Sequence, residues 1–281
     1  MIRSPLKWAG SKAGIMAELV KHLPVAKRLV EPFAGSCSVM MNTDYPEYLV
    51  ADINPDLINM YEAIRNCPAA FINHAALLFE KANSADEYYR RREEFRGNAL
   101  SPWDRAVTFL YLNRHGYGGM CRYNKDGQYN VPYGKYKKPY FPKVEIMAFA
   151  EKSERATFVC ADFRTTLAVV RPGDLIYCDP PYLPVSKTAD FSSYHTGGFS
   201  ASDHADLTAE LLRLTVSPRV PVVISNSDTT AARTLYGRFH IESITAPRAV
   251  GNRTGGKATA DELIASCAPC CDVGIGWNQT L

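Results

Sequence analysis

The sequence lacks any long apolar stretch. Nowhere in its 281 residues do about 18 apolar residues follow one another, as a membrane-spanning helix would require. The opening residues, from Met1 to Trp8, contain no apolar segment of the kind found in secretion signals. We therefore expect a cytoplasmic protein with no membrane partner.

The sequence also lacks a recognisable set of cross-links or metal ligands. Its eight cysteines are scattered along a chain without a secretion signal, which favours reduced thiols over disulfides. Only Cys267, Cys270 and Cys271 lie close together, and no second pair of Cys or His follows them at zinc-site spacing. We therefore predict no metal site.

The composition excludes a disordered chain, because 46% hydrophobic and 22% charged residues can bury a sizeable core. Amphipathic segments predict helices, one of which begins at Asn54 and Pro55 as N-cap and first residue. Short apolar runs between the helices predict strands at residues 28–31, 48–52, 157–160, 174–179 and 220–226. This alternation predicts an α/β fold with a doubly wound, mostly parallel sheet.

A strongly charged, mainly helical stretch interrupts this alternation. It begins after the second predicted strand and ends before the third. The predicted domains are therefore a sheet domain made of residues 1–54 and 144–281, and an insertion of residues 55–143.

The net charge of only +3 is unevenly distributed. Between Tyr111 and Lys143, seven basic residues stand against one acid, so this segment carries +6 and the rest of the chain −3. The same segment holds seven of the 16 tyrosines, together with asparagines and a glycine-rich turn. Cations, flat rings and amides are the side chains that contact phosphates, stack on bases and bond to base edges. The pattern favours a nucleic-acid-binding surface, and the alternative is a solvated basic loop.

The ends of the first two predicted strands carry residues suited to a nucleoside-bearing ligand. The segment from Glu31 to Ser36 contains a glycine turn, through which a ligand can approach backbone N–H groups. Asp52, at the end of the next strand, can accept both hydroxyls of a ribose. The pairing of a glycine turn with an acid on the next strand also occurs in dinucleotide sites. A lone glycine turn is often purely structural.

A third strand end carries Asp179-Pro180-Pro181-Tyr182. This tetrapeptide lies at the ligand-binding edge of the predicted sheet, and its two prolines fix the backbone. It either forms a rigid structural turn or holds an exocyclic amine. In the second case, the Asp179 carboxylate and the Pro180 carbonyl accept from the NH₂ group, while Tyr182 stacks on the ring.

In combination, these blocks resemble the Dam-type DNA adenine-N6 methyltransferases of the α order. The resemblance covers nearly the whole chain, is closest to the GATC-specific members, and implies a Rossmann-like methyltransferase sheet with a DNA-recognition insertion. The order and spacing of the blocks make it more specific than any single motif. The blocks are Lys7–Lys12, Pro32–Gly35, Ala51–Asn54, Phe109–Arg114, Met120–Asn124, Asn130–Gly134, Asp179–Tyr182 and Val222–Asn226.

The resemblance implies S-adenosylmethionine as cofactor, S-adenosylhomocysteine as product and no metal. It implies that the catalytic residues Asp179, Pro180 and Tyr182 act on N6 of an adenine flipped out of the duplex. Because that amine loses its proton as or after the new bond forms, neither a strong base nor a cysteine nucleophile is needed. The implied cofactor-binding residues are Trp8, Lys12, Phe33, Gly35, Asp52 and Asp179.

The resemblance also implies double-stranded DNA as partner, bound by a monomer or by more than one copy per site. It gives Arg122 a bidentate contact to a guanine, for which a planar guanidinium is suited. Tyr117 would enter the base stack. The other implied contacts are Lys7 to the outer guanine, Met120 and Pro132 to the thymine, and Asn124, Asn130, Tyr136 and Lys137 to phosphates.

The sequence departs from the family pattern at a few positions. Cys37 stands where the cofactor turn F-x-G-x-G has its second glycine, Gly118 replaces an Asn, and Met120 replaces a Leu. The alternatives that stay open are another short target, cytosine-N4 methylation, or a catalytically inactive DNA-binding relative. The biological role is equally open among repair, replication, phage protection and restriction-modification.

Overall fold

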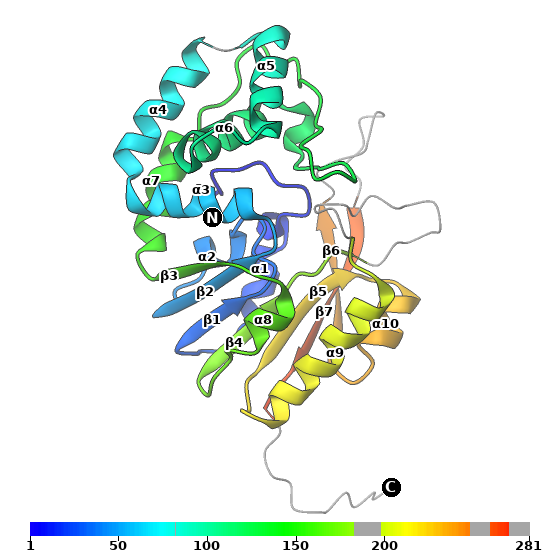
Figure 1. Ribbon diagram of the computed structural model, residues 1–281. Coiled ribbons are helices and arrows are strands. Elements are labelled where there is room, and N and C mark those ends of the chain that lie inside the picture. The colour runs from blue at the N-terminus through cyan, green and yellow to red at the C-terminus, as the bar shows by residue number, and fades with distance from the viewer. Residues whose placement is uncertain (82, 183–197, 248–258, 270–281) are drawn as a thin grey trace, which may run out of the picture.

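The computed structural model describes residues 1–81, 83–182, 198–247 and 259–269 (Figure 1). Within these ranges, one sheet of seven strands has the order β3-β2-β1-β4-β5-β7-β6. Strand β7 is antiparallel to both of its neighbours, and all other pairs are parallel. This confirms the predicted doubly wound, mostly parallel sheet. The strands are β1 (Arg28–Glu31), β2 (Glu47–Asp52), β3 (Ala156–Cys160), β4 (Asp174–Cys178), β5 (Val222–Ser227), β6 (His240–Pro247) and β7 (Thr259–Cys267).

Helices connect the strands and cover both faces of the sheet (Figure 1). The α-helices in the described ranges are α1 (Met16–Leu19), α2 (Ser38–Asn42), α3 (Pro55–Asn66), α4 (Pro68–Lys81), α5 (Ala85–Arg96), α6 (Pro102–His115), α7 (Lys143–Ser153), α8 (Phe163–Leu167), α9 (Ala201–Val216) and α10 (Thr230–Leu235). Short 3₁₀ turns are η1 (Lys12–Gly14), η2 (Val20–His22) and η3 (Tyr117–Gly119). None of the helices in the described part of the chain has both the length and the apolar composition needed to span a bilayer.

The two faces of the sheet are buried by different helices. In β1, Leu29 belongs to the core cluster shared with α3 and α7, whereas Val30 belongs to the one shared with α8, α9 and α10. The central strand β4 is buried along its whole length. A parallel strand covered on both faces reads as a continuous apolar run, which is why the sequence predicted it correctly.

The insertion between β2 and β3 packs closely on the sheet. Helix α3 begins as predicted, because the Asn54 side chain accepts hydrogen bonds from the backbone amides of Asp56 and Leu57 and Pro55 follows it. It contacts β2 and β3 on one side and α6 on the other. Buried residues of the insertion and of this sheet face therefore form one continuous core. The domain boundary at residue 55 stays a prediction, since α3 packs against both parts.

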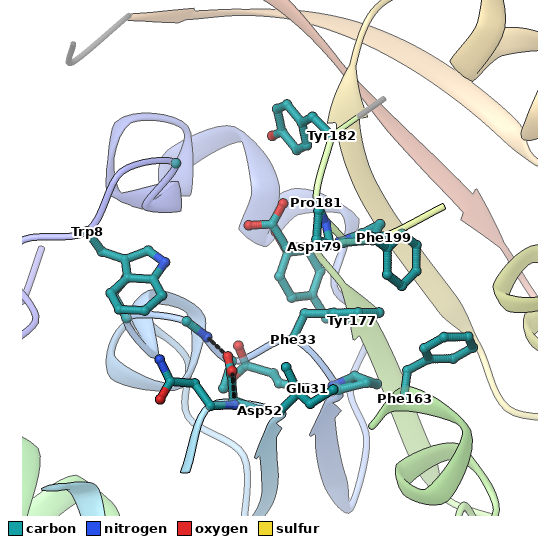
Figure 2. A pocket seen from close by; sticks show the side chains of 18 of the residues that line it. Trp8, Glu31, Phe33, Asp52, Phe163, Tyr177, Asp179, Pro181, Tyr182 and Phe199 are labelled. Atoms are coloured by element: carbon teal, nitrogen blue, oxygen red, sulfur yellow. Dashed lines mark hydrogen bonds between the residues drawn. The ribbon is translucent and has the colours of Figure 1, made fainter. Parts of the chain in front are cut away.

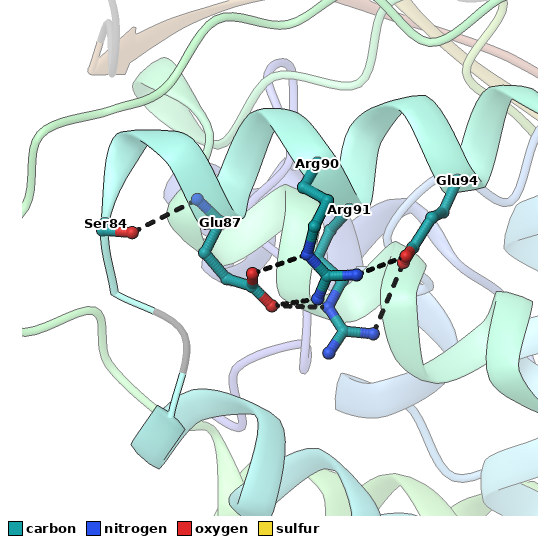
Figure 3. A network of polar contacts seen from close by, with 5 residues as sticks. All are labelled: Ser84, Glu87, Arg90, Arg91 and Glu94. Carbon is teal, nitrogen blue, oxygen red and sulfur yellow. Dashed lines mark hydrogen bonds and ion pairs between the residues drawn. The ribbon is translucent and has the colours of Figure 1, made fainter.

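The arginine-rich stretch of the insertion forms an internally paired helix. On α5, Arg90 and Arg91 both bond to Glu87 and Glu94, which lie three or four positions away, about one helical turn (Figure 3). Ser84 caps the helix by accepting from the Glu87 amide. Exposed pairs at this spacing contribute only about 0.3–0.5 kcal/mol each. They nevertheless neutralise the arginines locally, so this run adds little to the basic surface expected to face DNA.

Candidate active site and DNA-facing surface

A cavity of about 500 Å³ lies where β1, β2 and β4 end (Figure 2). These parallel strands bring their carboxyl ends to one edge of the sheet, where ligands of open α/β sheets bind. The structure therefore brings together all the residues predicted for cofactor and catalysis, although they come from four separate parts of the chain. The predicted residues that line the cavity are Trp8, Lys12, Phe33, Gly35, Asp52, Asp179, Pro180 and Tyr182.

The glycine turn after β1 is held against the end of β2. Gly35 has a φ of +45°, and a Cβ at this position would lie only 2.8 Å from Trp8 Nε1. Its backbone amide donates to Asp52 Oδ2 at 2.9 Å, and the Asn54 amide donates to Asp52 Oδ1, also at 2.9 Å. The turn thus requires glycine, and the Asp52 carboxylate is fixed in orientation at the cavity wall.

Cys37 does not narrow this cavity. It adopts the left-handed conformation with φ 56°, a conformation that glycine adopts with less strain. Its side chain is fully buried in the core between the sheet and the insertion, and it is not among the cavity-lining residues. The substitution therefore places the thiol in the protein interior rather than in the ligand site.

Three phenylalanines form an aromatic corner of the cavity (Figure 2). Phe33 and Phe163 stack with ring centroids 5.8 Å apart, and Phe199 meets each of them edge-on at 5.6 Å. Only Phe33 was predicted as a site residue. The other two lie beyond β3 and at the start of α9, and no local sequence pattern relates them to the first turn.

Asp179 sits at the centre of a polar network. Its Oδ2 forms an ion pair with Lys12 Nζ at 2.9 Å, and its Oδ1 accepts from Ser225 Oγ at 3.0 Å. Burial raises the pKa of Asp179 above its usual range, and the Lys12 ammonium opposes that rise. Lys12, predicted for the cofactor, therefore also orients the predicted catalytic carboxylate.

Tyr182 is held from two sides. The Lys12 ammonium lies 4.7 Å from the centroid of its ring. Its hydroxyl donates to Glu262 Oε2 at 2.9 Å. Glu262 lies on β7, opposite Ser227 of β5. No sequence pattern points to Glu262 or gives Ser225 a contact at this turn, because only the strand pairing brings the two residues to it.

Glu31, the last residue of β1, is a buried acid on the cavity wall. The backbone amide of Met40 contacts its carboxyl, but Oε1 has no hydrogen-bond partner among the described residues. Burial raises the pKa of this carboxyl to about 8. A buried polar atom without a partner costs free energy unless a ligand satisfies it. The sequence pattern places Glu31 in the glycine-turn segment and predicts no role for it.

The residues predicted to contact DNA fall into two groups. The first is a short hairpin in which Tyr123 and Tyr129 form a bridge. Arg122 is exposed beside it, and its Nε donates to Asn130 Oδ1 at 2.7 Å. Asn124 Oδ1 accepts the amides of residues 126 and 128 and so shapes the hairpin turn.

The second group surrounds the turn η3. Tyr117 is 58% exposed, as a ring that enters a base stack would need to be. Lys7 Nζ lies 4.2 Å from the ring centroid of Tyr136, whose hydroxyl accepts from the Gly118 amide. Of the other three predicted residues, Met120 is half-buried, whereas Pro132 and Lys137 are exposed.

The composition overstated the number of side chains available to DNA. Tyr111, Tyr123 and Tyr129 are buried in the core, as is Arg114, which donates to the Pro5 carbonyl. Interpreting the whole tyrosine-rich segment as a surface was therefore wrong. Aromatic rings are large apolar groups, and in this insertion several of them supply packing.

The cysteine pattern of the sequence adds no candidate metal site within the described residues. In the described ranges, no three side chains of His, Cys, Asp or Glu gather as metal ligands would. Cys267 ends β7, and Cys270 and Cys271 lie outside the described residues.

The seven-stranded, mostly parallel sheet flanked by helices is that of a Rossmann-like methyltransferase fold. The family model described as D12 class N6 adenine-specific DNA methyltransferase matches residues 8–250. The chain belongs to this family. It is therefore an enzyme, a DNA methyltransferase that modifies adenine at N6.

Curated relatives align over nearly their full length. The retron Ec67 DNA adenine methylase of Escherichia coli is 54% identical over 271 residues, which cover 96% of this chain and 93% of the relative. The DNA adenine methylase of Serratia marcescens is 47% identical over 94% of this chain and 97% of its own. That of Escherichia coli K12 is 43% identical over 95% and 96%.

Proposed function

We propose that this enzyme transfers a methyl group from S-adenosylmethionine to N6 of the adenine in GATC, releasing S-adenosylhomocysteine. The observation that carries the proposal is the position of Asp179. Its carboxylate lies on the wall of the cavity, next to Tyr182 and at the end of β4. A donor in the cavity and an amine on Asp179 would thus be neighbours, and such positioning supplies several kcal/mol of rate acceleration.

The cavity has the groups that S-adenosylmethionine requires. The aromatic corner of Phe33, Phe163 and Phe199 suits the adenine ring, and the fixed Asp52 carboxylate suits the ribose hydroxyls. Glu31 Oε1 needs a donor, which the amino end of the cofactor could provide. When bound, the cofactor supplies an electrophilic methyl group on a sulfonium. No metal is required for this chemistry.

In the proposed reaction, the protein polarises and holds the target amine. The Asp179 carboxylate and the Pro180 carbonyl accept hydrogen bonds from its two N–H groups, and Tyr182 stacks on the adenine ring. The one proton that N6 loses, as or after the new C–N bond forms, passes along the hydrogen bond to Asp179. Lys12 favours the ionised form of Asp179. Since an adenine stacked within a duplex cannot reach Asp179, the nucleotide must flip out of the duplex, at a cost of a few kcal/mol.

We assign target reading to the insertion, residues 55–143, together with Lys7. Arg122 contacts one guanine, Lys7 the outer guanine, and Met120 and Pro132 the thymine. The Tyr117 ring enters the base stack of the duplex. Asn124, Asn130, Tyr136 and Lys137 hold phosphates. The exposure of Arg122 and Tyr117 supports this assignment, as does the +6 charge of the segment that contains them.

Transfer of labelled methyl groups to duplexes tests the proposal. We expect incorporation into a GATC duplex and none into the same duplex already methylated on both strands. Absence of incorporation into any DNA would contradict it. Base-by-base sequencing of the product separates GATC from another short target, and adenine-N6 from cytosine-N4. We propose that the protein acts in the bacterial cytoplasm, in keeping with its bacterial relatives. We propose that it binds each DNA site as a monomer or as more than one copy.

Arg122→Ala tests the base-reading assignment. We expect it to lower the preference for GATC over singly altered sites by about 1–3 kcal/mol at one base pair, because a bidentate guanine contact is lost. The measurement is kcat/KM on a panel of duplexes with one altered base pair each. Lys125→Ala, in the exposed turn of the same hairpin, is the control and should leave these ratios unchanged. An equal loss on every duplex would make Arg122 a phosphate contact.

A further inference from the structure

The position of Lys7 is fixed by a buried amide. Asn113, in the last turn of α6, is fully buried. Its Oδ1 accepts from the Lys7 backbone amide at 2.9 Å, and its Nδ2 donates to the Lys7 carbonyl at 2.8 Å. The same Nδ2 donates to the Gly119 carbonyl at 3.0 Å. One side chain thus joins the N-terminal segment to the turn η3.

Gly119 provides the surface on which the Lys7 side chain lies. Its φ is +66°, and a Cβ at this position would overlap Lys7 Cβ and lie 2.6 Å from Lys7 Cδ. The overlap involves the root of the lysine side chain, which cannot swing away while Asn113 holds its backbone. The Lys7 ammonium is then placed over the Tyr136 ring, at the exposed side of the turn.

We propose that Asn113 and Gly119 are positioning residues that determine specificity at the base pair read by Lys7. Neither side chain needs to touch DNA. They act by fixing the backbone and the stem of Lys7, so that its ammonium reaches one base edge. The inference rests on the proposed function, in which Lys7 contacts the outer guanine of GATC.

A discrimination assay tests this inference. The ratio of kcat/KM on GATC to kcat/KM on a duplex with the outer G·C pair replaced by A·T is measured for each variant. We expect Lys7→Ala, Asn113→Ala and Gly119→Ala each to lower this ratio by about tenfold, the usual size of one lost base contact. Ratios at the other base pairs should stay within about twofold of the original.

The double variant Lys7→Ala/Asn113→Ala separates positioning from general support of the fold. Because Asn113 acts through Lys7, the double variant should lose no more discrimination than Lys7→Ala alone. Asn42→Ala is the matched control, since Asn42 bonds to both backbone groups of Ile2 as Asn113 does to those of Lys7. It should leave the ratio unchanged. Gly119→Ala retains the Asn113 hydrogen-bonding groups, so it tests the inference even where Asn113→Ala folds poorly.

Two results would overturn the inference. One is an equal loss of activity on all duplexes in Asn113→Ala and Gly119→Ala. The other is an unchanged outer-guanine ratio in Lys7→Ala. In either case, continued methylation of GATC by the unaltered chain shows that the proposed reaction and its target stand, and only the second result removes the contact of Lys7 with the outer guanine. Failure of the unaltered chain to methylate GATC would be a failure of that function instead.

Discussion

Asp179→Asn is expected to lower kcat by about 10²- to 10⁴-fold, the range typical for loss of a group that acts on the transferred proton or developing charge. The amide keeps the shape of the carboxylate and can still accept from Lys12 or Ser225. It cannot offer the target amine an acceptor that carries a full negative charge. Binding of GATC duplex should persist. Single-turnover methylation and a separate binding titration measure the two effects.

The control for this variant is a buried acid at the start of the strand that Asp179 follows. Asp174 begins β4 and pairs with Arg28 at 2.7 Å, with only 1% of its side chain exposed. Asp174→Asn weakens a buried ion pair at the opposite end of β4, so it should lower the melting temperature. It should leave kcat of the folded enzyme unchanged. A near-normal rate in Asp179→Asn would contradict the role given to this residue.

Glu31→Gln is expected to change the pH dependence of stability. The Glu31 carboxyl has a pKa of about 8 in the folded protein, against 4.5 as the ordinary value. Since the folded state binds this proton more tightly, its contribution is complete below pH 4.5 and is lost as the pH rises through about 8. Between pH 5 and pH 8, this group lowers the unfolding free energy by up to about 4 kcal/mol.

Gln cannot ionise, so the variant should be more stable than the original chain at pH 8 and similar to it at pH 5. Urea unfolding without cofactor at both pH values measures this. Binding of S-adenosylhomocysteine should weaken, because Oε1 is the unpartnered atom on the cavity wall. Glu47→Gln, at an exposed surface pair with Arg171, is the control. Parallel pH profiles in Glu31→Gln and the original chain would contradict the prediction.

The sheet and the main site residues could be predicted because their signals are local. A buried strand such as β4 reads as an apolar run, and parallel strands bring their carboxyl ends together whatever the loops do. Gly35 lies in the turn after β1, Asp52 ends β2, and Asp179 directly follows β4. Their meeting in one cavity therefore follows from topology alone, without knowledge of any side-chain contact.

Other features depend on pairing between distant segments, and the sequence could not provide them. Glu262 reaches Tyr182 only because β7 returns antiparallel beside β5. The burial of Tyr129 and the exposure of Tyr117 follow from how the insertion folds back on itself, and a count of tyrosines cannot distinguish them. The composition gives the total charge of the insertion, whereas the structure decides which charged side chains are exposed to a DNA duplex.

The N-terminal segment has a consequence for how far the two parts can be exchanged. Arg114 and Asn113 of α6 hold Pro5 and Lys7, and a few residues further on the same segment supplies Lys12 to Asp179. The insertion is therefore not a self-contained module. In a chimera that takes residues 55–143 from a relative, the side chains that bond to Pro5 and Lys7 come from the other protein. New target preference and an intact donor site would have to be engineered together, with the N-terminal segment and the insertion transplanted as one unit.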